Sequence, residues 1–387
     1  MELIEKLKHR LIGKKIVVYG AADTGTRFMI ECERAGMTVD YLVDSSELQW
    51  GKKVFDKEVR SPYDLLYEDK DNLRIVVCSL TGKTAIVATL EGMGFDTETH
   101  IITDYADFRD GCTHVDMMLG ISRGNQNIMQ IGEVSGGKAA LTILILGGST
   151  SDPTYCGINS WSYYLKKKMR EKALNVSILN GAVLTYNSSQ ELLCLIRDGL
   201  HKKPDIVISY TGVNEYNLSA KLADKTKYPL VNKNLYDTME RLSSNYKENH
   251  FLPPIYYGEK TVEDFDNFLY NVRSMKALCN EFGAKFFCLF QPILKHQQIE
   301  KNTLLERLME QDGVIELNDN FDKFYGRLCE VKSKYDYIYD FTDIFCNVSD
   351  VFVDSSHVNE KGNEIIAEKV LKLLEKELWS SHNECSE

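Results

Sequence analysis

The chain has 387 residues, of which 43% are hydrophobic and 27% charged, and its formal net charge is −11. That length favours more than one domain, and the composition is that of an ordinary globular protein able to bury a core. The acidic balance and the lack of a basic cluster argue against nucleic acid or a membrane as partner, so a small-molecule or glycan ligand is expected.

The N-terminal residues 1–15 alternate charged and apolar side chains, without the apolar centre of a signal peptide. No apolar run in the chain approaches the roughly 18 residues of a membrane span. The ten cysteines are scattered singly, with no CxxC pair, which favours reduced thiols over disulfides or zinc. We therefore expect a cytoplasmic protein without a metal site.

Residues 1–110 alternate short apolar strands with helical patterns. The expected strands are 14–19, 39–43 and 73–78, with helices after the first and the third. Such alternation is typical of βαβ units on a parallel sheet, so the sequence predicts an α/β, Rossmann-like half domain.

The turn after the first strand keeps two glycines of a dinucleotide fingerprint, Gly20 and Gly25, but has Ala22 where the second glycine belongs. Asp44, at the end of the second strand, is the acidic residue that could meet a ribose hydroxyl. The pattern leaves three alternatives open: binding of a nucleotide or nucleotide-sugar, dimerisation, or docking of the following domain.

Residues 111–138 lose periodicity and accumulate glycines, which predicts a linker. A second α/β alternation fills 139–387, with strands at 141–146, 176–179, 205–209, 285–290 and 337–341, and helices at 160–172, 188–200, 262–282 and 359–378. We expect Ser188 and Glu191 to form a capping box at the second of these helices. Residues 217–260, rich in Tyr, Asn and Lys, interrupt the alternation and are interpreted as a lid or substrate wall, with a passive surface excursion as the alternative.

Distinctive residues follow four of these strands. Ser149 follows the first, Gly181 the second and Asn214 the third, while Asp354 and His357 follow the last. The carboxyl ends of parallel strands meet at one edge of the sheet, where ligands bind. These residues are therefore expected to form one site.

Each residue type suits acyl transfer. Ser149 would be the nucleophile, His357 the base that takes its proton, and Asp354 the group that orients the imidazole. The backbone N–H groups of Ser149 and Gly181 and the side-chain amide of Asn214 would form an oxyanion hole. Gln291-Pro292, after the fourth strand, either shapes the pocket or simply makes a turn.

The order of these motifs resembles that of the SGNH, or GDSL-like, hydrolase superfamily of esterases and lipases. The four blocks read Gly147-Gly148-Ser149-Thr150, Asn180-Gly181, Gly212-Val213-Asn214-Glu215 and Asp354-Ser355-Ser356-His357. The resemblance implies a flavodoxin-like parallel sheet flanked by helices. The first block departs from Gly-Asp-Ser and the third from Asn-Asp, which is closer to the carbohydrate-directed esterases than to the lipase-like members.

Through its glycine loop and the strand end Tyr41-Leu42-Val43-Asp44, the N-terminal segment resembles the Rossmann-like domain of sugar-modifying acyltransferases and sugar-nucleotide enzymes. Together the two resemblances imply a serine esterase that removes an acyl group, most simply acetyl, from a carbohydrate or small-molecule ester, with no required cofactor. An O-acyltransferase that passes the Ser-bound acyl group to a sugar is the first alternative. A non-catalytic nucleotide-sugar-binding protein is the second alternative. Whichever function holds, the protein could also form oligomers.

Overall fold

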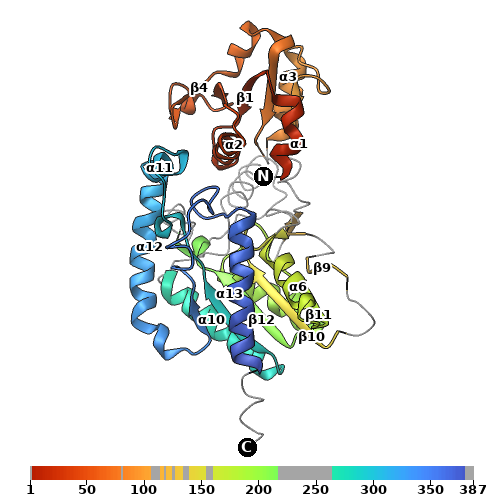
Figure 1. Ribbon diagram of the computed structural model, residues 1–387, viewed down its shortest axis with the longest axis vertical. Helices are drawn as coiled ribbons and strands as arrows, with labels where there is room; N and C mark the ends of the chain where they lie inside the picture. Colours follow the sequence, from red (N-terminus) through yellow and green to blue (C-terminus); the bar gives the residue numbers. More distant parts are fainter. Residues whose placement is uncertain are drawn as a thin grey trace, which may run out of the picture. The chain divides into compact units, whose positions relative to one another are not determined.

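The computed structural model describes residues 2–79, 82–105, 114–116, 119–123, 127–133, 139–153, 160–216 and 264–379. The chain divides into two compact units (Figure 1). Unit 1 contains residues 1–111, 298–311 and 349–359, and unit 2 contains residues 112–297, 312–348 and 360–387. The interpreted lid at 217–260 lies outside the described residues.

The first unit is built on a mostly parallel sheet. Its described strands are β1 (Lys15–Tyr19), β2 (Tyr41–Val43), β3 (Lys53–Val54), β4 (Lys57–Arg60), β5 (Leu73–Val77) and β6 (Ile101–Ile102), in the order β3-β4-β2-β1-β5-β6. All neighbours are parallel except β3 and β4. Without β3 the order is the 3-2-1-4-5 of a Rossmann sheet, whose ligand crevice lies beside the first strand.

Helices α1 (Glu2–Leu11), α2 (Asp23–Arg34) and α3 (Lys83–Gly92) accompany this sheet, and the short α11 (Leu304–Met309) belongs to the same unit. Val17 and Val18 of β1 are completely buried, as expected for a central parallel strand covered on both faces. Gly25 is required at the start of α2, because a β-carbon there would lie 2.0 Å from the carbonyl oxygen of Gly20.

The second unit has the flavodoxin-like strand order. Its strands β9 (Met129–Ile131), β10 (Leu141–Gly147), β11 (Val176–Asn180), β12 (Ile206–Thr211), β13 (Lys285–Phe290) and β14 (Ile338–Asp340) run β14-β13-β12-β10-β11-β9. All neighbouring strands are parallel except the edge strand β9. Counted from β10, this is the order 2-1-3-4-5, which places the crevice between β10 and β12.

Helices α6 (Trp161–Glu171), α7 (Ser188–Cys194), α10 (Asp264–Glu281), α12 (Asp312–Val331) and α13 (Glu360–Trp379) flank this sheet (Figure 1). Helix α6 packs against α13, and α7 packs against α10. The sequence predicted the α/β class and the five strands β10 to β14 correctly. None of the helices in the described parts of the chain is both long and apolar enough to cross a membrane.

Three local predictions need correction. Residues 129–131, expected within a linker, form the edge strand β9 because they pair with β11 in an antiparallel register. The capping box of α7 is made by Asn187 and Gln190, not by Ser188 and Glu191. The helix predicted at 188–200 is α-helical only as far as Cys194. It is followed by a π-helical turn, Leu195–Gly199, and a 3₁₀ turn, Leu200–Lys202.

The long helix α12 was not predicted, although its sequence carries a signal. Its buried positions are Val314, Leu317, Phe321, Phe324 and Leu328. They recur at intervals of three and four residues, which is the spacing of one helix face.

Candidate active site

Two glycines at the end of β10 bring the Ser149 turn against the end of β12. A β-carbon on Gly147 would lie 2.6 Å from the carbonyl oxygen of Tyr210, and one on Gly148 would lie 2.4 Å from Asn214 Nδ2. Real β-carbons do not approach other atoms so closely. Position 147, where φ is 154° and the close atom belongs to the backbone, therefore requires glycine, whereas a side chain at position 148 would have to displace the Asn214 amide. The Gly-Gly-Ser block thus allows a close approach that a larger residue would prevent. Ser149 itself is 9% exposed.

Asn214 is held at the same edge by the loop after β11. Its Nδ2 atom donates a hydrogen bond to the carbonyl oxygen of Tyr186 at 2.8 Å. A primary amide nitrogen carries two hydrogens, of which Tyr186 accepts one. The structure therefore brings the Ser149 turn and Asn214 together in unit 2.

The contacts of Gly181 argue against its predicted role in that hole. Its backbone N–H donates to the carbonyl oxygen of Ile145 at 2.8 Å, which continues the pairing of β10 with β11. A β-carbon at Gly181 would lie 2.7 Å from Ile128 Cδ1 and 3.2 Å from Cys194 Sγ. Gly181 therefore serves sheet pairing and close packing.

The loop that follows Gly181 contains a strained residue. Thr185 has a φ of 68°, in the left-handed region that β-branched residues rarely occupy. It precedes Tyr186, whose carbonyl accepts the Asn214 amide. Such strain persists only where surrounding contacts impose it, and it is often found at functional sites.

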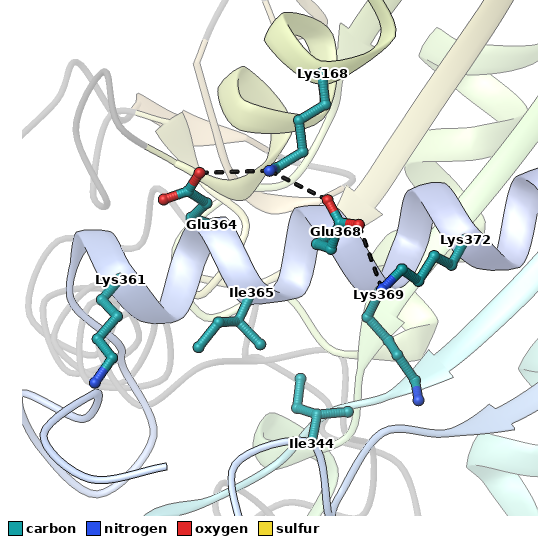
Figure 2. A pocket seen from close by; sticks show the side chains of 8 residues that line it. All are labelled: Lys168, Ile344, Lys361, Glu364, Ile365, Glu368, Lys369 and Lys372. Carbon is teal, nitrogen blue, oxygen red and sulfur yellow. Dashed lines mark hydrogen bonds and ion pairs between the residues drawn. The ribbon is translucent and has the colours of Figure 1, made fainter. Parts of the chain in front are cut away.

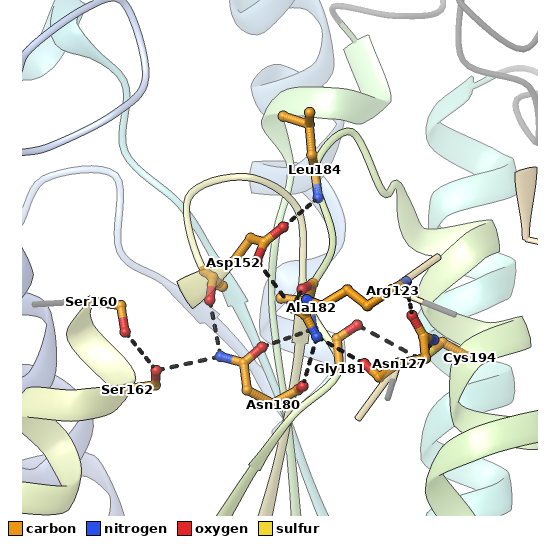
Figure 3. A network of polar contacts seen from close by, with 11 residues as sticks. Arg123, Asn127, Asp152, Ser160, Ser162, Asn180, Gly181, Ala182, Leu184 and Cys194 are labelled. Carbon is orange, nitrogen blue, oxygen red and sulfur yellow. Dashed lines mark hydrogen bonds and ion pairs between the residues drawn. The ribbon is translucent and has the colours of Figure 1, made fainter. Parts of the chain in front are cut away.

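An ion pair that the sequence analysis missed ties this loop to the Ser149 turn (Figure 3). Arg123 Nη2 lies 3.1 Å from Asp152 Oδ1, and the two side chains are 4% and 1% exposed. Asp152 Oδ2 accepts the backbone N–H of Leu184 at 2.9 Å, and Arg123 also donates to the carbonyl oxygens of Asn180 and Ala182. The signal in the sequence was Asp152, an acidic residue three positions after Ser149. It was missed because it lies outside the Gly-x-Asn and Asp-x-x-His motifs.

Gln291 also reaches the Ser149 turn. Thr150 Oγ1 donates to Gln291 Oε1 at 3.2 Å, and the Gln291 side chain is buried at the end of β13. This contact lies at the sheet edge where the sequence analysis placed Gln291-Pro292.

Asp354 and His357 meet in unit 1. Their loop is closed by a bridge between Phe352 and Val358, and by a hydrogen bond from Val353 N–H to the carbonyl oxygen of His357. His357 Nδ1 lies 2.9 Å from Asp354 Oδ1 and 2.8 Å from Oδ2. Because an ionised carboxylate can only accept, the hydrogen of the neutral imidazole is on Nδ1, and Nε2 is left as the basic nitrogen.

The Asp354 carboxylate is stabilised in its charged form. Its Oδ1 accepts the backbone N–H groups of Ser356 at 2.9 Å and His357 at 2.7 Å. Arg27 Nη1 lies 3.6 Å from Asp354 Oδ2. Burial by itself would raise the pKa of Asp354, but His357, Arg27 and the Ser356 amide together hold it well below its usual range.

In the Rossmann-like part of unit 1, Asp44 holds the glycine loop. Its Oδ2 accepts the N–H of Ala21 and its Oδ1 the N–H of Ser46, both at 2.9 Å. Gly20 and Gly25 lie at the close approach of β1 and α2 described above. The three predicted cofactor-binding residues thus lie together. The described hydrogen bonds of Asp44 hold the backbone of the glycine loop and of the turn that follows β2.

A surface groove of about 490 Å³ lies elsewhere on unit 2 (Figure 2). It runs along α13 and α6, and Lys168 spans it to reach Glu364 at 3.4 Å and Glu368 at 3.2 Å. None of the residues predicted for catalysis lines it. Among the described residues, no group of acidic, His and Cys side chains has the arrangement of a metal site.

Comparison with known proteins identifies the family. The model of the family described as GDSL-like Lipase/Acylhydrolase matches residues 125–370, a region that contains all four motifs. None of the curated proteins matches the chain.

Solved structures show low similarity. The acetyl xylan esterase AlAXEase is 11% identical, with 60% of this chain and 100% of that chain covered and a TM-score of 0.40. An acetylxylan esterase from Geobacillus stearothermophilus is 15% identical, with 63% and 95% covered and a TM-score of 0.37. A lipase from a goat rumen metagenome is 14% identical, with 60% and 97% covered and a TM-score of 0.38. On the strength of the family match, which spans more than half of its length, the chain belongs to the GDSL-like lipase/acylhydrolase family and is an ester-hydrolysing enzyme.

Proposed function

We propose that the protein is a serine esterase in which Ser149, His357 and Asp354 form a catalytic triad. The observation that carries this proposal is the Asp354–His357 pair, hydrogen bonded through Nδ1 at 2.8 Å. A carboxylate that holds Nδ1–H and leaves Nε2 basic is the arrangement a general base requires. Ser149, presented by a turn packed against Asn214, is the matching nucleophile.

In the proposed reaction, Ser149 Oγ bonds to the ester carbonyl carbon while its proton passes to His357 Nε2. The resulting imidazolium is stabilised by the negative charge of Asp354. The bond to the alcohol oxygen then breaks, and that oxygen takes the proton from Nε2. A water molecule repeats the sequence on the acyl-Ser149 intermediate, releasing the acid and restoring the serine.

The developing oxyanion needs donors that are already in place. We assign this role to the backbone N–H of Ser149 and the side-chain amide of Asn214. Gly181 is left out of this assignment because its backbone N–H already donates to the carbonyl oxygen of Ile145. Removing one such donor typically lowers kcat by about 10²- to 10³-fold.

For the substrate we propose an acyl group, most simply acetyl, on a carbohydrate or small-molecule ester. The support is the sequence of the first and third blocks, Gly-Gly-Ser and Asn-Glu, which departs from the lipase-like pattern. We further propose that the protein acts in the cytoplasm.

The test is intact-mass labelling of the full chain with a serine-reactive fluorophosphonate. A single adduct on the wild type that is absent from Ser149→Ala would support an activated nucleophile at Ser149. A panel of acetylated sugars and short-chain esters, with and without added sugar acceptor, would then separate hydrolysis from acyl transfer. An adduct that persists on Ser149→Ala, or none on the wild type, would contradict the proposal.

A further inference from the structure

Helix α2 carries two buried charged residues. Arg27 is 5% exposed and Glu31 is 4% exposed, and Arg27 Nε donates to Glu31 Oε1 at 3.0 Å. Charged side chains are seldom buried this completely unless they are paired, because removing them from water is costly. Their burial calls for an explanation beyond the Rossmann-like part of unit 1.

The remaining contacts of this helix face supply one. Arg27, Glu31 and Arg34 are spaced at i, i+4 and i+7, so they lie along one face of α2. Arg27 Nη1 is 3.6 Å from Asp354 Oδ2, and Arg34 Nη2 is 2.7 Å from Asp350 Oδ1. Arg34 also donates to the carbonyl oxygen of Phe352, which forms part of the bridge that closes the His357 loop.

We propose that Arg27 is a positioning residue for the Asp354–His357 pair, so that the Rossmann-like part of unit 1 is a working part of the esterase. This inference rests on the proposed function of that pair. Arg27 Nη1 lies 3.6 Å from Asp354 Oδ2, the oxygen that is 2.8 Å from His357 Nδ1, while Asp354 Oδ1 accepts the two loop amides. Glu31 holds the guanidinium from the other side.

The placement has a chemical consequence. A positive charge beside Asp354 keeps the carboxylate ionised and fixed in direction, and it offsets part of the negative charge that faces the imidazole. Among the described residues, the titratable and charged groups in contact with the carboxylate are His357 from its own loop and Arg27 from α2, and Arg27 in turn pairs with Glu31. Arg34 and Asp350 form a separate pair in the same region. Loss of Arg27 should therefore both loosen the carboxylate and favour protonation of the ring.

The experiment compares the full-length wild type with Arg27→Gln, in which the amide can still hydrogen bond to Glu31. Two readouts are taken: kcat and KM with a short-chain ester as a function of pH, and the His357 ring titration followed by NMR. We expect kcat to fall by about 10- to 100-fold with KM nearly unchanged, as for a misplaced catalytic group. The acid limb of kcat/KM and the ring titration should both move to higher pH.

Two further variants test the physical cause. Arg27→Lys retains a positive charge and should recover most of the rate and the wild-type titration. Arg10→Met removes an ion pair with Asp104 on the surface of the same unit and should leave both readouts unchanged. If Arg27→Gln does not fold, the double variant Arg27→Met, Glu31→Met replaces it, because apolar replacement of a whole buried pair is often tolerated.

The inference is overturned if Arg27→Gln keeps the wild-type kcat and ring titration, even where its melting temperature falls. The role of Arg27 is tested separately from the triad. If the wild type fails to react with the fluorophosphonate, the proposed function is contradicted. The NMR titration of His357 in Arg27→Gln still decides whether Arg27 acts on the Asp354–His357 pair.

Discussion

The side-chain amide of Asn214 lies directly against the backbone of Gly148, because a β-carbon on Gly148 would be only 2.4 Å from Asn214 Nδ2. The same β-carbon would lie 3.0 Å from the carbonyl oxygen of Tyr186, which accepts the Asn214 hydrogen bond. One added methyl group at Gly148 would therefore displace the proposed oxyanion donor and its acceptor together.

Gly148→Ala should lower kcat by about 10²- to 10³-fold, similar to Asn214→Ala, because either change removes the amide from its position. Steady-state kinetics on both variants and on the double variant measure the effect. The double variant should be little worse than either single one. The matched control is Gly326→Ala in α12, where a β-carbon would meet no atom within 4 Å. Full activity in Gly148→Ala would remove Asn214 from the mechanism.

Ser149→Ala, His357→Ala and Asp354→Ala should each cost several orders of magnitude in kcat, and the combined variants should cost little more than the worst single one. The reason is that the three groups act as one unit, so the loss of any member disables the others. Measurement of kcat for the three single variants and the triple variant tests this. Losses that multiply across the variants would mean that the residues act independently.

Breaking the Arg123–Asp152 pair should affect both stability and rate. Arg123→Met leaves the Asp152 carboxylate buried without its cationic partner, which typically costs about 3–5 kcal/mol in the free energy of unfolding. It also removes the contacts that hold the loop at Ala182, so kcat should fall in the folded fraction. Denaturant unfolding and kinetics on Arg123→Met measure the two effects.

The matched control for that variant is Arg327→Met in the same unit. Arg327 pairs with Asp266 at 2.7 Å, but both side chains are nearly half exposed. Exposed pairs contribute about 0–1 kcal/mol, so this variant should be close to wild type. Equal losses in the two variants would show that the burial of Arg123 has no special role.

Glu191 should make the stability of the protein depend on pH. Burial raises its pKa from the ordinary 4.5 to about 7, against the opposing effect of hydrogen bonds from Ser209 and Thr211. Since the pKa is higher in the folded state, the contribution of Glu191 is fully present below about pH 4.5 and is lost as the pH rises through about 7. At high pH the free energy of unfolding of the wild type should have fallen by about 3 kcal/mol relative to that of Glu191→Gln.

Denaturant unfolding of the wild type and of Glu191→Gln at several pH values measures this difference. The wild type should lose stability relative to the variant between about pH 4.5 and 7, and the difference should stay constant at higher pH. Glu364→Gln, on the exposed face of α13, is the control and should run parallel to the wild type. A constant difference between the wild type and Glu191→Gln at every pH would contradict the assignment.

Much of the fold follows from local patterns in the sequence. The central strands are runs of consecutive apolar residues, and their limits were predicted to within two residues at 141–146 and 285–290 because both faces of a parallel strand are buried. The Asp354–His357 contact is equally local, since a residue that starts a tight turn can accept from the amides and the ring two and three positions later. Even α12, which was missed, has its buried positions in a helical repeat.

The rest was decided by contacts between residues distant in the sequence. Whether the Gly181 amide is available depends on the register of β11 against β10, which an isolated Asn-Gly pair does not reveal. The Arg123–Asp152 pair joins residues 29 positions apart, and Arg27 reaches Asp354 across more than three hundred residues. Sequence alone therefore determined which chemical groups are present and which local turns present them. Only the tertiary structure decided which amides sheet pairing consumes and which charges share a buried environment, because both depend on side chains that the folded chain brings together.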